Sequence, residues 1–276
     1  MKSIQTALLF SKEFYEQIKK DPIQDWAATL AFYFMLSIFP FLIFLLSLLP
    51  YLPLDVEVIY NFVHDVAPPE LAELFTETVL EVIQEPKGGL LSFGILATIW
   101  TSSNGINALI HALNRAHNII ETRSFLKIRL LSIFLTFGTV IVFFVTLLLP
   151  VFGNLILTSI NELFFIPEET FVILNRLRWL IGAVIMTSVL MLVYMIAPNR
   201  KLSFRHVLYG ALMATISWQI ISFSFSLYIA NFNNFTATYG SLGGVIVLML
   251  WFYLSGLILI IGGEINATLY NLREQK

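Results

Sequence analysis

Six apolar runs of about 20 residues each constrain the fold of this chain more than any other feature. They occupy residues 26–51, 90–113, 126–152, 179–197, 207–229 and 243–267. A run of this length crosses the hydrocarbon core of a bilayer as a helix. Of the 276 residues, 58% are hydrophobic and 12% charged, whereas a soluble domain has roughly 25% charged residues. The sequence predicts an all-α membrane protein with six transmembrane helices, forming a single polytopic membrane domain over residues 1–276.

The basic residues predict the orientation of these helices. Thirteen of the 16 lysines and arginines lie in the N-terminal segment, in the loops after the second and fourth runs, or in the C-terminal tail. The other three are at positions 87, 176 and 178. Because basic residues concentrate in the cytoplasmic loops of membrane proteins, both termini are expected to be cytoplasmic.

Two segments outside the apolar runs have an amphipathic pattern. In residues 1–22, Ile4, Leu8, Tyr15 and Ile18 share one helical face. This pattern favours a cytoplasmic interfacial helix on the inner leaflet over a regulatory arm. Residues 53–89 hold eight acidic residues and one lysine, and predict an external amphipathic segment that lies on the outer membrane surface or caps the bundle.

A stripe of polar residues follows one side of the second run. With a turn of about 100° per residue, Asn104, Asn107, His111 and Asn114 fall within one sector of the helix. Amide and imidazole groups are costly in hydrocarbon unless they face a bundle interior or a wet cavity. The candidate translocation path or polar core also includes residues of the first and fifth runs, namely Tyr33, Ser37, Pro40, Gln219 and Ser222.

Charged residues are predicted to meet at the cytoplasmic mouth of the bundle, where four helix ends reach the same level. This candidate cluster consists of Asp25, Arg115, Arg205 and Glu264. A carboxylate at this depth is tolerated when a cation pairs with it, and Arg115 is the expected partner of Glu264. The cluster could couple an ion or gate a substrate, with His111 titrating near neutral pH. It could equally be a salt-bridge network that locks the bundle, and the sequence leaves both interpretations open.

Three motifs together resemble the YihY/BrkB family of bacterial inner-membrane proteins. They are YGSLGGVIVLMLWFYLSGLILIIGGEINATL, LSIFPFLIFLLSLLP and TIWTSSNGINALIHALNRAHNI. The likeness covers residues 25–272 and implies a six-helix, multi-pass protein of the bacterial cytoplasmic (inner) membrane. Family names include a virulence factor and a ribonuclease label, and some members have been linked to movement of envelope lipids. The polar positions of the three motifs have no agreed role in the family. In this chain they are Asn104, Asn107, Asn114, Gly263, Glu264 and Asn266.

The residues do not support the ribonuclease label. RNA hydrolysis needs a metal cage of carboxylates and histidines, or a histidine acid–base pair, together with a basic surface. The four histidines are scattered, and no HxxxH, HxH or DxD pattern groups ligands. The chain has no cysteine and no GxxxxGK[ST] loop, which argues against thiol chemistry and nucleotide-driven pumping. We therefore expect no enzymatic activity, no cofactor or metal, and no nucleic-acid partner.

Two functions remain compatible with the sequence. The first is a transporter or flippase of an amphipathic envelope lipid or lipid-linked glycan, suggested by the polar stripes, Pro40 and the charged mouth. The second is a structural or partner-binding membrane protein, in which the stripes only hold helices together. In both cases the lipid bilayer is the main partner, and an envelope lipid or glycolipid is the expected substrate of the first.

Overall fold

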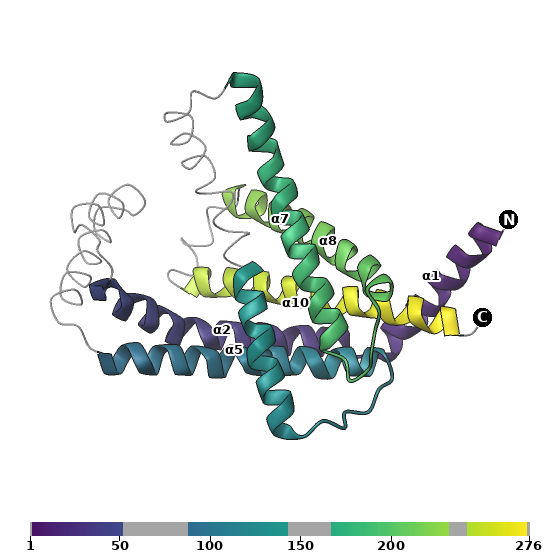
Figure 1. The fold of residues 1–276 in the computed structure, drawn as a ribbon, viewed down its shortest axis with the longest axis horizontal. Coiled ribbons are helices and arrows are strands. Elements are labelled where there is room, and N and C mark those ends of the chain that lie inside the picture. Colours follow the sequence, from purple (N-terminus) through teal and green to yellow (C-terminus); the bar gives the residue numbers. More distant parts are fainter. Residues whose placement is uncertain (1, 52–87, 143–166, 232–241, 275–276) are drawn as a thin grey trace. The chain divides into compact units, whose positions relative to one another are not determined.

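A computed structural model describes residues 2–51, 88–142, 167–231 and 242–274 of the chain, and these form helices without any β-strand (Figure 1). The external segment predicted at 53–89 lies almost wholly outside the described residues. In chain order the elements are α1 (Lys2–Lys20), α2 (Ile23–Leu48), the short 3₁₀ helix η1 (Leu49–Tyr51), α5 (Gly88–Ala116), the helix Phe125–Val142, α7 (Glu168–Ile196), α8 (Phe204–Asn231) and α10 (Leu242–Glu274).

Where it is described, every predicted apolar run coincides with a helix, and the all-α membrane fold is confirmed. Five helices are long and apolar enough to cross a membrane, at Ile23–Leu48, Phe125–Val142, Trp179–Ile196, Phe204–Tyr228 and Gly243–Glu274. At 29 residues α5 has the required length, but the serine, threonine and asparagine side chains in TSSNGIN make it too polar to meet the same criterion. The described residues thus support five spans by composition, one fewer than predicted.

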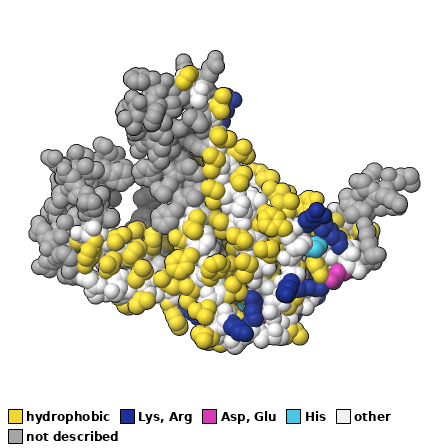
Figure 2. Space-filling model, in the orientation of Figure 1, with side chains coloured by type: hydrophobic (Ala, Val, Ile, Leu, Met, Phe, Trp, Pro, Cys, Tyr) yellow, Lys and Arg dark blue, Asp and Glu magenta, His cyan; other side chains and the backbone are white. Residues whose placement is uncertain are grey.

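The outer surfaces of these helices are apolar (Figure 2). Large hydrophobic side chains such as Leu96, Phe134 and Phe223 are each more than half exposed. A soluble protein rarely exposes so much contiguous apolar surface. Lipid tails accept such a surface, and the helices satisfy their own backbone groups, as hydrocarbon requires.

The chain divides into two compact units, and the larger contains Met1–Phe32 and Ser103–Lys276. In this unit α8 packs against both α7 and α10, and α1 packs against α10. Side chains from several helices form its core, including Leu113, Tyr194, Val207 and Ile260, none more than 1% exposed. The core therefore lies among the ends of α5, α7, α8 and α10.

Glycines allow a close crossing of α8 and α10. A Cβ at Gly210 would overlap the Gly262 carbonyl oxygen, and a Cβ at Gly262 would lie 2.9 Å from the Gly210 carbonyl oxygen. A Cβ at the adjacent Gly263 would overlap Leu113 of α5. Small residues let helix backbones approach closely in membranes. This crossing brings Glu264, the next residue of α10, into the core of the larger unit.

The smaller unit is Tyr33–Ser102, which joins the second part of α2 to the first part of α5. The two helices approach closely at Gly94, where an added Cβ would lie 2.7 Å from the Phe44 backbone nitrogen. In this unit α2 continues through Pro40, and the Ser37 hydroxyl donates to the Phe34 carbonyl at 2.7 Å. The single polytopic domain stays a prediction.

Candidate functional site: a buried glutamate in α10

Glu264 is the most completely enclosed charged side chain among the described residues, with 0% exposure. The Gln17 amide nitrogen, on α1, donates to Glu264 Oε2 at 2.7 Å and to the Ala116 carbonyl at 2.7 Å. The Thr268 hydroxyl lies 2.9 Å from Gln17 Oε1 and donates to it. One glutamine thus links α1 to α10 and to the end of α5.

The second Glu264 oxygen, Oε1, is enclosed and has no hydrogen-bond partner in the described part of the chain. No lysine, arginine or histidine among those residues forms an ion pair with Glu264. Burying a carboxylate without a paired cation is costly. An amide is therefore the principal polar contact of this carboxylate.

Asp21 lies in the short turn between α1 and α2 and is 5% exposed. Its Oδ1 is 3.6 Å from the Arg115 Nε, while the Arg115 side chain is 63% exposed. Burial raises the pKa of Asp21, and the positive charges of Lys20 and Arg115 act in the opposite direction. We refer to Gln17, Asp21, Arg115 and Glu264 as the Glu264 cluster.

The predicted pairing of Arg115 with Glu264 is wrong, because Arg115 pairs with Asp21 instead. The physical reason is solvation: the exposed guanidinium keeps its water while it reaches Asp21, and enclosing it beside Glu264 would remove that water. Asp25 and Arg205 are both exposed, and neither forms an ion pair with Glu264 where the chain is described. The four predicted charges therefore do not form one network.

Asn114 belongs to a separate polar group. Its Nδ2 donates to Glu121 Oε2 at 2.7 Å, and its Oδ1 accepts from the Asn199 backbone N–H at 2.7 Å. Arg123 donates to both Glu121 oxygens, with Nε–Oε1 of 2.8 Å and Nη2–Oε2 of 2.6 Å. These bonds hold the pKa of Glu121 at about 2, mainly through Arg123. The group ties the connection after α5 to the connection between α7 and α8.

The other predicted residues of α5 lie in different surroundings. Asn104 Oδ1 accepts from Arg129 Nη1, of the helix Phe125–Val142, at 2.5 Å. Asn107 is half-buried, and its enclosed Oδ1 has no hydrogen-bond partner in the described chain. His111 is exposed. In the predicted stripe, Asn104 therefore forms a hydrogen bond between two helices, Asn107 has an unpaired amide oxygen in the described chain, and His111 lies on the surface.

The predicted residues of α8 also differ from one another. Gln219 is exposed, whereas Ser222 is half-buried with an enclosed hydroxyl that lacks a hydrogen-bond partner among the described residues. Tyr33, Ser37 and Pro40 belong to the smaller unit. The translocation path through these residues stays a prediction.

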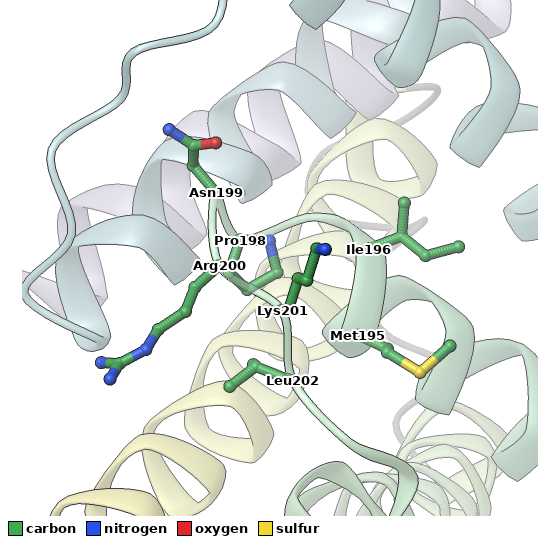
Figure 3. Close-up of a pocket in the computed structure, with 7 residues that line it drawn as sticks. All are labelled: Met195, Ile196, Pro198, Asn199, Arg200, Lys201 and Leu202. Atoms are coloured by element: carbon green, nitrogen blue, oxygen red, sulfur yellow. The ribbon is translucent and has the colours of Figure 1, made fainter.

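A shallow pocket of about 400 Å³ lies at the connection between α7 and α8 (Figure 3). Its lining consists of Met195, Ile196, Pro198, Asn199, Arg200, Lys201 and Leu202. The Arg200 guanidinium lies 2.7 Å from Glu274 and 4.3 Å above the Tyr270 ring. Figure 3 shows the Asn199 and Arg200 side chains directed away from those of Met195 and Ile196. With its arginine already paired, this pocket is a weaker candidate than the Glu264 cluster.

Sequence reasoning missed Gln17 and Asp21. The Gln17–Glu264 contact joins residues 247 positions apart, so periodicity within a single helix could not indicate it. The one signal in the sequence was Asp21-Pro22, since proline restricts the preceding residue and marks a helix boundary. Across the described ranges, no three His, Cys, Asp or Glu side chains are grouped to hold a metal ion.

Comparison with known proteins identifies the family of this chain. Its sequence matches the family described as Virulence factor BrkB over residues 14–276. The chain belongs to the BrkB family. A relative from Bacillus subtilis, named putative ribonuclease-like protein YfkH, is 43% identical over 96% of both chains. A UPF0761 membrane protein of Photobacterium profundum is 30% identical over 92% of this chain and 78% of its own. No solved structure matches the chain.

The resemblance to the BrkB family is thereby confirmed. The family match, the relatives named as membrane proteins and the apolar helices together make the chain a multi-pass membrane protein. Within that fold, the Glu264 cluster is the site that the geometry distinguishes most strongly.

Proposed function

We propose that this BrkB-family protein moves an amphipathic envelope lipid, or a lipid-linked glycan, across the bacterial cytoplasmic membrane. The observation that carries the proposal is Glu264, a fully buried carboxylate in the apolar helix α10 with one oxygen unpaired among the described residues. Ionisable residues inside membrane helices are rare and mark substrate or ion pathways. Both termini are cytoplasmic in this proposal.

A purely structural role explains Glu264 less well. A buried charge that only holds helices together is expected to be paired and fully hydrogen-bonded, and replacing such a group with apolar residues is often neutral or stabilising. Glu264 receives one amide bond and no ion pair in the described chain. A group that must change its charge or its partner during a cycle fits this arrangement better.

The structural alternative has its own support, from Asn104 and Asn114. Asn104 is bonded to Arg129, and Asn114 is bonded to Glu121 and Asn199. Both asparagines hold separate segments together, as polar residues in membrane bundles do. In this alternative, the protein is a structural or partner-binding component of the envelope.

Our proposal includes no enzymatic activity for this chain, despite the ribonuclease-like name of YfkH. His117 is enclosed, its Nδ1 lies 3.0 Å from the Leu113 carbonyl, and burial lowers its pKa. His206 Nδ1 lies 2.6 Å from the Ser203 hydroxyl. The enclosed imidazole of His117 is poorly suited to the acid–base role that RNA hydrolysis needs.

Translocation of fluorescent lipids by the full chain in proteoliposomes tests the proposal. We expect Glu264→Gln to slow movement at least about tenfold, equivalent to about 1.4 kcal/mol in the barrier. Glu274→Gln is the matched control, because it makes the same chemical change in the same helix at a side chain that is 53% exposed. Lack of movement by the unaltered protein across a broad panel of lipids and lipid-linked glycans would favour the structural alternative.

A further inference from the structure

We infer that Glu264 is a proton-binding site, that the negative charge of Asp21 favours its protonation, and that Gln17 of α1 covers it. This inference names the coupling ion of the site described above. It rests on the proposed function only for the link to transport. Proton binding itself is a separate property of the chain.

An enclosed carboxylate oxygen without a hydrogen-bond donor carries this inference. It is Glu264 Oε1, which has no hydrogen-bond partner among the described residues. The Gln17 side chain donates to Glu264 Oε2, and the Gln17 carbonyl accepts from the Asp21 backbone N–H at 3.0 Å, so one residue contacts both. A negative charge on Asp21 opposes a negative charge on Glu264, which favours the protonated form of a buried carboxyl group.

A proton fits this site better than a metal ion. A proton needs a single oxygen to bind, which the unpaired Glu264 Oε1 provides. Calcium takes six to eight oxygen ligands, and magnesium requires near-ideal octahedral coordination. The described part of the chain has no group of three or more carboxylate or histidine ligands here.

The charged groups around Glu264 come from the end of α1, the turn that follows it and the end of α5. Lys20 and Asp21 follow Gln17 at the end of α1, and Arg115 is at the end of α5. The Lys20 ammonium donates to Asn118 Oδ1 at 3.0 Å, and Arg115 pairs with Asp21. Arg115 is therefore paired with Asp21 and not with Glu264, so a proton on Glu264 leaves Asp21 ionised beside its cation.

Gln17 is suited to act as a cover. Its amide nitrogen uses both hydrogens, one on Glu264 Oε2 and one on the Ala116 carbonyl, which leaves Oε1 available for the proton. Beyond this contact, Leu8 and Tyr15 of α1 are at least 60% exposed, as expected of a helix lying in the membrane interface. Movement of α1 would therefore open the path from the cytoplasm to Glu264.

Infrared difference spectra of the full chain in detergent, recorded as the pH is raised, test the proton site directly. We expect a carbonyl band from a protonated carboxylic acid in the unaltered protein and in Glu274→Gln, and its loss in Glu264→Gln. An unchanged band in folded Glu264→Gln would overturn the assignment.

Two further variants test the effect of Asp21 and the cover, and remain informative if Glu264→Gln does not fold. Asp21→Asn removes a neighbouring negative charge and frees Arg115, so the band is expected to disappear at a lower pH than in the unaltered protein. An unchanged midpoint would overturn the effect of Asp21. Gln17→Ala is expected to speed hydrogen–deuterium exchange of the same band, and an unchanged exchange rate would overturn the cover.

These spectra need no lipid substrate, which separates the two proposals. A protonated Glu264 in a protein that moves no lipid would overturn the proposed function and support the proton site. Lipid movement by a protein whose band is insensitive to Glu264→Gln would overturn the proton site and support the function.

Discussion

At the scale of single residues, Glu121 is the carboxyl group whose pKa is lowered most by its hydrogen bonds. Arg123 and Asn114 hold the pKa of Glu121 at about 2, below the ordinary value of 4.5. Because the folded-state pKa is depressed, the stabilisation is fully present above the ordinary pKa and is lost as the pH falls from there through about 2. Acid should therefore weaken the connection between the end of α5 and the α7–α8 loop.

Glu121→Gln is predicted to lower the thermal stability at neutral pH by an amount that shrinks under acid. Thermal unfolding of the detergent-solubilised protein between about pH 7 and about pH 2 would measure this dependence. Glu13→Gln, at an exposed position on α1, is the control and should leave the pH profile unchanged. A stability difference for Glu121→Gln that stays constant down to the lowest pH would contradict the prediction.

Asn104 separates the structural and transport interpretations of the polar stripe. Its side-chain oxygen accepts a hydrogen bond from Arg129, so Asn104→Leu should destabilise the protein by about 1–3 kcal/mol, as loss of an acceptor for a charged donor does. Asn104→Asp keeps the acceptor and should retain most of the stability. Translocation per folded molecule is expected to survive in Asn104→Leu if the residue only ties helices together, and to be lost if Asn104 lies on the lipid path.

At the scale of helices, the crossing of α8 and α10 depends on glycine. Gly210→Ala would place a methyl group against the Gly262 carbonyl oxygen and the Asn266 amide, so the backbones must move apart. We predict a loss of about 1–3 kcal/mol, typical of overpacking. Gly244→Ala is the control, since a Cβ there meets nothing within 4 Å, and the higher helix propensity of alanine should make it neutral or slightly stabilising. Equal thermal stability of the two variants would show that the crossing tolerates separation.

The helices were predictable from the sequence because membrane spans are local features. Apolar length alone located α2, α7, α8 and α10, although the structure extends α10 to Glu274. The stripe on α5 was correctly identified as polar, and the same polar residues explain why α5 is not apolar enough to count as a span. Local hydropathy therefore determined the positions of the helices but not the contacts between them.

The Glu264 cluster shows why contacts between helices were harder to predict. Depth along a helix suggested that Glu264 lies near the end of α5, and Gln17 does contact both Glu264 and Ala116. It could not show which of the two carboxylates takes the exposed guanidinium, because that depends on the desolvation of each group in the folded bundle. The contact from Gln17 came from a helix predicted to lie on the membrane surface, far away in sequence.

At the scale of the whole molecule, the natural absence of cysteine makes the predicted topology directly measurable. Single cysteines can replace exposed basic side chains at Lys12, Lys127, Arg176 and Arg273. Because basic residues favour the cytoplasmic side, an impermeant maleimide should label Arg176→Cys in intact cells and the other three variants only after permeabilisation.

The comparison of Lys127→Cys with Arg176→Cys is the most stringent of these measurements, since the helix Phe125–Val142 separates the predicted levels of the two residues. Labelling of both from the same side would contradict the predicted topology. It would also remove the argument that α1 and Glu264 face the cytoplasm. Opposite labelling would place the Glu264 cluster at the cytoplasmic end of the bundle, where a proton could reach it when α1 moves aside.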